Sequence, residues 1–101
     1  MNVLFICNQN QNRSKTAERV FKDRFKTKSA GLYNEKPVTE KQLGWADKIV
    51  VMDESQRSEI AKRFPSAYLK KRIISLNIPD TYHKDQPELI NALKEKIEEI
   101  L

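Results

Sequence analysis

The sequence predicts an α/β protein in which a parallel sheet has helices on both faces. Two runs of consecutive apolar residues, Val3–Ile6 and Ile49–Met52, are typical of strands buried on both faces of such a sheet. Elsewhere, apolar residues recur at three- and four-residue spacings, as in helices that cover a sheet. A chain of 101 residues has room for one hydrophobic core, so residues 1–101 are expected to form a single domain.

The first half of the chain is expected to continue as helix, strand and helix after the strand at Val3–Ile6. Apolar residues at helical spacing predict a helix from about Ser14 to Lys26. The segment Lys28–Ala30 is a short candidate strand. A second helix is expected over Thr39–Ala46, where Thr39 and Gln42 have the spacing of a capping box.

The second half is expected to repeat this alternation after the second buried strand. Asp53 and Gln56 again have the capping-box spacing, and the helix that they begin is expected to stop at Pro65. The last expected strand is Arg72–Ile78. An amphipathic C-terminal helix is expected from near Pro87, since proline is favoured in the first turn of a helix.

Three residues with ionisable side chains lie where the expected strands end. Cys7 follows the first strand, Asp53 follows Ile49–Met52, and Asp80 lies just beyond the last strand. The carboxyl ends of parallel strands meet at one edge of a sheet, and open α/β proteins bind their ligands there. We therefore expect the functional site at this edge.

The segment from Cys7 to Arg13 has the features of an anion-binding loop. A loop that leads from a strand into a helix presents backbone N–H groups and a helix N-terminus to one small concavity, which suits a phosphate group. The same donors stabilise a thiolate, and Arg13 offers a planar fork for two phosphate oxygens. Ser14 can donate a hydrogen bond to the sulfur of Cys7, and Asn10 can adopt a left-handed backbone. The expected phosphate-binding residues are Asn8, Gln9, Asn10, Gln11, Asn12, Arg13 and Ser14.

The sequence resembles the low-molecular-weight protein tyrosine phosphatases, because Cys7, Arg13 and Ser14 match their Cys-x5-Arg-Ser signature. This resemblance implies a four-stranded parallel sheet in a three-layer α/β/α arrangement. It also implies a metal-independent reaction through a cysteinyl-phosphate intermediate, without a cofactor, and an aspartate acid after the last strand. The further matching segments are Thr16–Glu18, Ser29–Gly31, Ala46–Asp47 and Val51–Asp53.

The chain also departs from the family pattern. Gln9 stands where the family usually has glycine, Asn12 where it has a second cysteine, and Lys15 where it has proline. The segment between Gly31 and Val38, which in the family helps to form the wall around the substrate ring, is shorter. The chain therefore resembles a compact member of the family.

Asp80 is the expected general acid, because Asn77 has no titratable proton and Asp80 is spaced from the C-terminal helix as the family acid is. The alternatives are Asp85, although its place before Pro87 favours a role as a helix cap, and a reaction without a side-chain acid. Tyr82 is expected to line the substrate pocket, as aromatic residues of this loop do in the family.

The leading function is hydrolysis of phosphotyrosine or other aryl phosphate monoesters. The expected partners are then a phosphotyrosine protein or a small aryl phosphate, with inorganic phosphate and other oxyanions as inhibitors. A cysteine phosphocarrier or an arsenate-reductase-like protein on the same fold is the alternative, but a phosphocarrier has no use for Arg13 and arsenate reduction usually employs further cysteines. The net charge of +5 leaves a non-catalytic phosphate- or nucleic-acid-binding domain as a third possibility.

Composition restricts the class of protein further. We see no apolar run of membrane-spanning length and no signal peptide, so no membrane partner is expected. The only cysteine cannot form an internal disulfide, which fits a reducing cytoplasm. No metal site can be assembled around His83, the sole histidine. A solvated face is the default for clustered basic residues, so nucleic acid is not the expected partner.

Overall fold

A computed structural model describes residues 1–100 of the chain. Its strands are β1 (Asn2–Cys7), β2 (Lys26–Gly31), β3 (Lys48–Val51) and β4 (Arg72–Ser75). They form one parallel sheet in the order β2-β1-β3-β4. The expected four-stranded parallel sheet is therefore confirmed.

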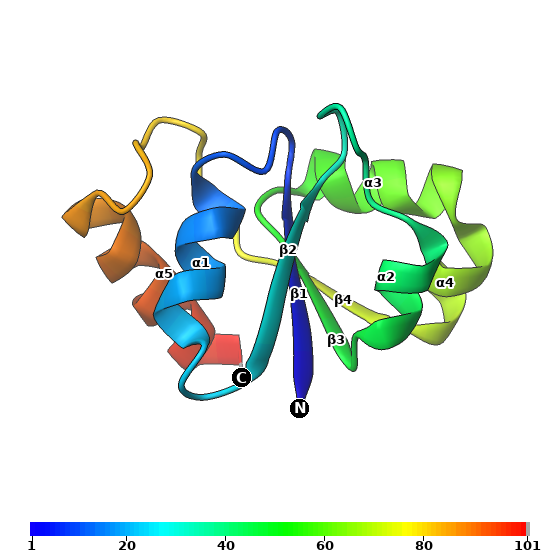
Figure 1. Ribbon diagram of the computed structural model, residues 1–101, viewed down its shortest axis with the longest axis horizontal. Coiled ribbons are helices and arrows are strands. Elements are labelled where there is room, and N and C mark those ends of the chain that lie inside the picture. Colours follow the sequence, from blue (N-terminus) through cyan, green and yellow to red (C-terminus); the bar gives the residue numbers. More distant parts are fainter. Residues whose placement is uncertain (101) are drawn as a thin grey trace.

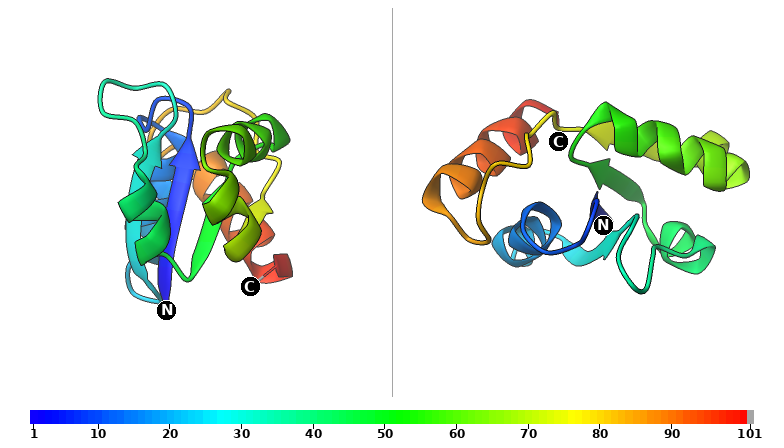
Figure 2. Two further views of the ribbon diagram at one scale, coloured as in Figure 1. Left: turned by 90° about the vertical axis from the view of Figure 1, so that its right-hand side faces the viewer. Right: turned by 90° about the horizontal axis from the view of Figure 1, so that it is seen from above.

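Helices cover both faces of the sheet. On one face lie α1 (Arg13–Phe21) and α5 (Pro87–Ile100), and on the other lie α2 (Glu40–Trp45), α3 (Glu54–Arg63) and α4 (Pro65–Lys70) (Figure 1). Seen from above, the two groups of helices lie on opposite sides of the strands (Figure 2). This is the expected three-layer α/β/α arrangement. None of the helices in residues 1–100 combines the length and apolar character that a membrane span requires.

Strand β1 contributes to both layers of the core, because successive side chains of a strand point to opposite faces. Val3, Phe5 and Cys7 pack on the side of α1 and α5, whereas Leu4 and Ile6 pack on the side of α2 and α3. All five are buried. The alternation places the side chain of Cys7 on the face that α1 covers, directly below the loop that joins β1 to that helix.

The boundary between α1 and β2 differs from the expected one. The helix ends at Phe21 rather than Lys26, because the N–H groups of Arg24 and Phe25 both donate to the carbonyl of Phe21 and close the last turn. The chain then enters β2 at Lys26, so this strand is longer than the predicted segment Lys28–Ala30.

The helices on the other face begin where the capping pattern predicts. The side chains of Thr39 and Asp53 each accept a hydrogen bond from the backbone N–H three residues on. The glutamine side chain at that position accepts a hydrogen bond from the backbone N–H of the cap residue, so both capping boxes are confirmed. The helix that follows Asp53 ends just before Pro65, as expected, but the helix that begins at Pro65 was not predicted from the sequence. Helix α3 ends at Arg63. Pro65 begins α4, whose first turn needs no N–H from proline.

The segment after β4 runs on along the sheet although it is no longer a strand. The strand ends at Ser75 rather than Ile78, because Asn77 has a left-handed backbone with a φ of 55°. The N–H groups of Leu76 and Ile78 still donate to backbone carbonyls at and just after the end of β3. The carbonyl group of Ile78 therefore lies close to the carboxyl end of β3.

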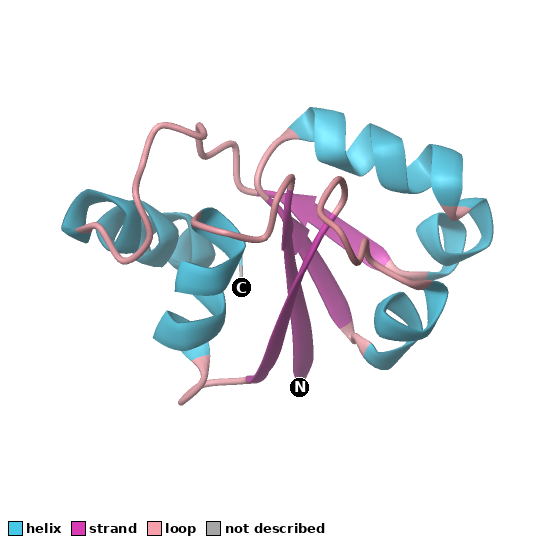
Figure 3. Ribbon diagram, turned by 45° about the horizontal axis from the view of Figure 1, so that its top comes forward, coloured by secondary structure: helices cyan, strands magenta, loops and turns pink. Residues whose placement is uncertain are grey.

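The strand order determines where a ligand is expected. From β1 the chain first passes to β2 at one edge and later returns to β3 on the other side of β1. In open parallel sheets, ligands bind at the carboxyl ends of the strands where the order reverses in this way. Figure 3, in which this edge of the sheet is turned forward, shows the connecting loops that gather over it.

Candidate active site

A cavity of about 40 Å³ lies at the carboxyl end of β1. A cavity that holds one water molecule needs roughly 10–15 Å³, so this space suits a small group such as a tetrahedral oxyanion. The structure thus brings Cys7, Arg13 and Asp80 to one place, whereas Asn10 and Ser14 do not line the cavity. Its lining residues are Cys7, Asn8, Gln9, Gln11, Asn12, Arg13 and Asp80.

The loop between β1 and α1 contains one left-handed residue. Asn10 has a φ of 55°, as expected of a residue type that tolerates this conformation, whereas Gln9 does not have a positive φ. Glutamine in place of the family's glycine therefore brings no strain of this kind. Asn12 makes no side-chain hydrogen bond that caps α1, so the first N–H groups of the helix remain available to an anion.

A chain of hydrogen bonds connects the sulfur of Cys7 to this loop. Its Sγ lies 2.9 Å from Oγ of Ser14, and that oxygen lies 2.7 Å from Oδ1 of Asn10. A hydroxyl has one proton, so Ser14 donates to Asn10 while the thiol of Cys7 donates to Ser14. When the thiol ionises, Ser14 can donate to the sulfur and a rotated Asn10 amide can donate to Ser14. The chain can therefore serve both protonation states of Cys7.

Arg13 is buried, with a side chain that is 1% exposed. Its Nη1 donates to the carbonyl of Ile78 at 2.8 Å and lies 3.4 Å from Oδ2 of Asp53. Its Nε has no hydrogen-bond partner within residues 1–100 and lies 3.6 Å from Oδ1 of Asp80. A buried N–H without a partner costs about 1–3 kcal/mol, and an oxyanion in the cavity would remove this cost.

Asp53 and Gln56 have a second role that the sequence reasoning missed. Gln56 is buried, and its Oε1 accepts the N–H of Met52 at 2.7 Å while its Nε2 donates to Oδ1 of Asn8 at 3.1 Å. The same capping box thus starts α3, holds one residue of the Cys7 loop and orients Arg13 through Asp53. The signal in the sequence was the position of the box, directly after a strand at the ligand-binding edge.

The pKa of the Asp53 carboxyl lies below its ordinary value of 3.8. Burial alone would raise this pKa. Hydrogen bonds from the hydroxyl of Ser55, the N–H of Gln56 and the guanidinium of Arg13, together with the charge of Arg13, outweigh the effect of burial. Asp53 is therefore an ionised partner for Arg13 at neutral pH.

We expect Asp53→Asn to lower stability at neutral pH but to have little effect in acid. Asparagine is also a good N-cap, so the variant loses mainly the interaction with Arg13. A carboxyl with a depressed folded-state pKa stabilises the fold above its unfolded-state pKa, and this contribution is lost as the pH falls through the folded-state value. The difference in urea midpoint between wild type and variant should therefore shrink between about pH 7 and about pH 3.

The matched control is Glu95→Gln, which removes an exposed carboxylate on α5. It should change the urea midpoint little at either pH. Equal differences between wild type and Asp53→Asn at both pH values would contradict the role given to the charge of Asp53.

The other residues singled out in the sequence do not line the cavity. Tyr82 is half-buried and packs against the core beside α1 and α5. Asp85 was expected to cap α5, but its carboxylate pairs with Arg19 at 2.8 Å and so helps to fasten the loop that carries Asp80 to α1. The histidine, His83, is exposed, and residues 1–100 contain no group of three or more His, Cys, Asp or Glu side chains placed to hold a metal ion.

Tyr33 is an exposed aromatic residue beside the Cys7 loop. Its N–H donates to the carbonyl of Asn8 at 2.9 Å, and the residue is 53% exposed. The guanidinium of Arg63 lies 4.9 Å from the ring centroid of Tyr33 and donates to the carbonyl of Leu32 at 2.6 Å. Gly31 permits the backbone of Asn8 to approach closely, because a Cβ at residue 31 would lie 3.0 Å from the carbonyl oxygen of Asn8.

The architecture of the chain is that of the low-molecular-weight protein tyrosine phosphatases. The phosphatase of this class from T. tengcongensis matches with a TM-score of 0.78 at 20% identity, covering 100% of this chain and 99% of that chain. The tyrosine phosphatase Wzb from Escherichia coli K30, in complex with phosphate, matches with 0.77 at 20% identity, covering 97% and 94%. The YwlE arginine phosphatase from Geobacillus stearothermophilus matches with 0.67 at 18% identity, covering 97% and 84%.

These likenesses extend over the whole chain at low sequence identity, and they show the fold. The Cys7–Ser14 loop fits the phosphate-binding loop of that fold, since it joins the end of β1 to α1 around a cavity of oxyanion size. No protein-family profile matches the chain, and no curated protein matches it in sequence. Activity and substrate are therefore argued from the site.

Proposed function

We propose that this protein is a phosphatase that hydrolyses phosphotyrosine or other aryl phosphate monoesters through a cysteinyl-phosphate intermediate. The observation that carries the proposal is one small cavity that Cys7, the buried Arg13 and Asp80 line together. These are a nucleophile, a stabiliser of negative charge and a proton donor. The fold shared with tyrosine phosphatases supports the same conclusion.

The reaction would proceed in two steps. In the first, the thiolate of Cys7 attacks phosphorus, the bond from phosphorus to the aryl oxygen breaks, and Asp80 donates a proton to the departing oxygen. In the second, Asp80 accepts a proton from water, which attacks phosphorus and releases inorganic phosphate and the thiolate. The phosphate complex of the Wzb phosphatase supports the expectation that phosphate and other oxyanions inhibit the enzyme.

Arg13 is suited to bind the phosphoryl group because contacts with the protein already hold its guanidinium group in place. Nη1 is held by the carbonyl of Ile78 and by Asp53, which leaves the unpartnered Nε for a phosphate oxygen. An entering oxygen would replace Asp80 beside Nε. The Asp80 side chain is 59% exposed, so it can turn toward the leaving group. This arrangement favours hydrolysis over a phosphocarrier, which has no use for such an arginine.

The substrate ring needs a neighbouring surface, and Tyr33 is an exposed aromatic residue that can supply it. Its backbone bond to Asn8 holds it next to the cavity lining, whereas the half-buried Tyr82 packs against the core. Tyr33 therefore takes the role that the sequence suggested for Tyr82. Because arginine phosphatases share the fold, a phosphoarginine peptide belongs in the same substrate panel. Faster hydrolysis of that peptide than of a phosphotyrosine peptide would overturn the proposed substrate class.

Asp80→Asn is expected to slow phenyl phosphate far more than a nitrophenyl ester. A phenol leaving group has a pKa of about 10, so its expulsion at neutral pH requires a proton donor, whereas a nitrophenolate hardly needs one. The loss should be roughly a hundredfold or more for phenyl phosphate and much smaller for the activated ester. Initial rates with a series of aryl phosphates of graded leaving-group pKa measure this directly.

Asp85→Asn is the matched control, because it removes a carboxyl group from the same loop. It should cause only a small loss that does not depend on the leaving group, through the weakened contact with Arg19. A leaving-group dependence in this variant instead of Asp80→Asn would reassign the acid. If neither variant shows the dependence, the site serves easier leaving groups and the phosphotyrosine assignment is wrong.

A further inference from the structure

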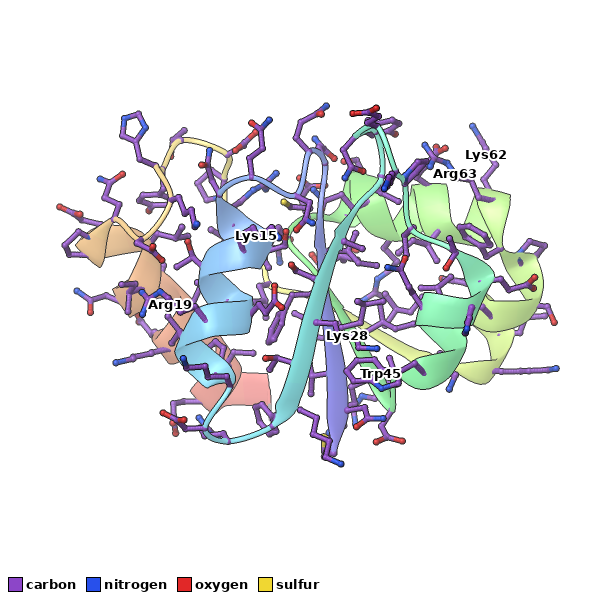
Figure 4. The ribbon with its side chains drawn as sticks, viewed as in Figure 1. Lys15, Arg19, Lys28, Trp45, Lys62 and Arg63 are labelled. Atoms are coloured by element: carbon purple, nitrogen blue, oxygen red, sulfur yellow. The ribbon has the colours of Figure 1, made fainter. Side chains whose placement is uncertain are left out.

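A second, larger cavity of about 410 Å³ runs along the exposed face of α1. Lys15 and Arg19 lie four residues apart on α1, and Lys22 follows three residues later as its C-cap, so the three form a single stripe. Figure 4 shows Lys15 and Arg19 at successive levels of α1. We call this surface the α1 groove, and its lining residues are Lys15, Glu18, Arg19, Lys22, Thr27 and Lys84.

The α1 groove is positively charged. Four of its six lining residues are cations, and only Glu18 is an anion. Glu18 accepts a hydrogen bond from Ser29, and Arg19 is already paired with Asp85. The groove lysines that make no ion pair with any residue in the part of the chain that the structure describes are Lys15, Lys22 and Lys84.

The groove begins beside the proposed active site. Arg13 is the first residue of α1, so Lys15 lies in the same first turn. On the other side, Lys84 belongs to the loop that carries Asp80. A phosphorylated residue held in the small cavity would therefore have its neighbours in the chain close to this basic surface.

The spacing of the lysines suits an extended peptide. Lys15 and Lys22 are separated by seven positions, which corresponds to roughly 10 Å along a helix. An extended peptide covers that distance in about three residues at roughly 3.3 Å each. Carboxylates of nearby peptide residues can thus reach both ends of the stripe.

We propose that the α1 groove binds acidic residues that flank the phosphorylated residue of a protein substrate, an inference that rests on the proposed phosphatase function. Such a peptide can place its carboxylates beside the lysines and neutral groups beside Glu18 and Thr27. Nucleic acid fits less well, because its continuous phosphates would meet the carboxylates of Glu18 and Asp85. In addition, no lining residue is aromatic, so the groove offers no surface for base stacking.

The test compares two phosphotyrosine peptides that differ only in whether the flanking residues are Asp and Glu or Asn and Gln, with nitrophenyl phosphate as a small substrate. In Lys22→Glu/Lys84→Glu, kcat/KM for the acidic peptide should fall about tenfold, because two attractions become repulsions. The values for the neutral peptide and the small ester should stay within about twofold. In wild type, added salt should reduce the preference for the acidic peptide.

Lys62→Glu/Lys70→Glu is the matched control, because it makes the same charge change at two exposed lysines of α3 and α4, on the other face of the sheet (Figure 4 labels Lys62). It should leave discrimination between the peptides unchanged. An equal loss in this control would show that net charge matters and the groove does not. An unchanged rate with the acidic peptide in Lys22→Glu/Lys84→Glu, or an equal loss with the small ester, would also overturn the proposal.

A binding assay separates failure of the groove from failure of the proposed function. If wild type does not hydrolyse the small ester, the proposed function is wrong, and the groove is tested by fluorescence anisotropy of the labelled acidic peptide. Binding that Lys22→Glu/Lys84→Glu weakens and the control variant does not would support the groove, whereas equal binding by all three proteins would overturn it. Displacement of the peptide by a lower concentration of single-stranded DNA would reassign the surface to nucleic acid.

Discussion

Cys7→Ser is expected to abolish turnover of aryl phosphates while leaving phosphate or vanadate binding measurable. A serine hydroxyl is not ionised near neutral pH, so the nucleophile is lost although the loop amides and Arg13 remain. Loss of a covalent nucleophile typically lowers kcat by a thousandfold or much more, on the order of the largest effects seen for single catalytic residues. Initial rates and phosphate titration of the two proteins measure both parts of the prediction.

Alkylation of the only cysteine provides a second test of the role of Cys7. Cys7 is the only cysteine, so a thiol-alkylating reagent should abolish the proposed activity through this sulfur alone. Inorganic phosphate should slow that inactivation, because it fills the cavity that Cys7 and Arg13 line. Full activity in Cys7→Ser, or in alkylated wild type, would refute the cysteinyl-phosphate mechanism.

Arg13→Lys is expected to lower kcat/KM by roughly a hundredfold or more, in the range typical of lost electrostatic stabilisers. Lysine keeps the charge but loses the planar fork. In wild type, Nη1 donates to the carbonyl of Ile78 and contacts Asp53, while Nε has no hydrogen-bond partner among residues 1–100. A single ammonium group cannot satisfy the protein and reach the phosphoryl group with that geometry. Steady-state kinetics with an aryl phosphate check the expected loss.

Arg24→Lys is the control for this prediction, since it makes the same substitution at an exposed arginine beyond the end of α1. It should leave the kinetic constants unchanged. An Arg13→Lys variant close to wild type would mean that the loop binds its ligand by charge alone. The fork geometry inferred from the contacts with Ile78 and Asp53 would then have no part in the reaction.

The sequence by itself determined the class of fold and the position of the loop that fits the phosphate-binding loop of that fold. The run Val3–Ile6 is apolar at every position because β1 is buried on both faces, and this is visible without a structure. The capping boxes at Thr39 and Asp53 were also predictable, because each is formed by groups three residues apart. The spacing from Cys7 to Arg13 was sufficient to place both side chains at one cavity.

Only the tertiary structure decided which residues support Arg13. Its partners Asp53 and Ile78 are 40 and 65 residues away in the sequence. They reach it because β3 lies beside β1 and because a left-handed Asn77 ends β4 early. Short-range patterns carry no information on strand order, since contacts across the sheet depend on how the whole chain packs.

The same limit applies to the aromatic residues near the Cys7 loop. The family resemblance suggested a place in the substrate pocket for Tyr82; in the structure this residue is half-buried, packs against the core beside α1 and α5 and does not line the cavity. Tyr33 reaches the Cys7 loop instead, through its backbone bond to Asn8, because β2 pairs with β1 and both strands end at the same edge. Local chemistry is therefore predictable from the sequence, whereas the position of Tyr33 beside the Cys7 loop follows from the strand pairing.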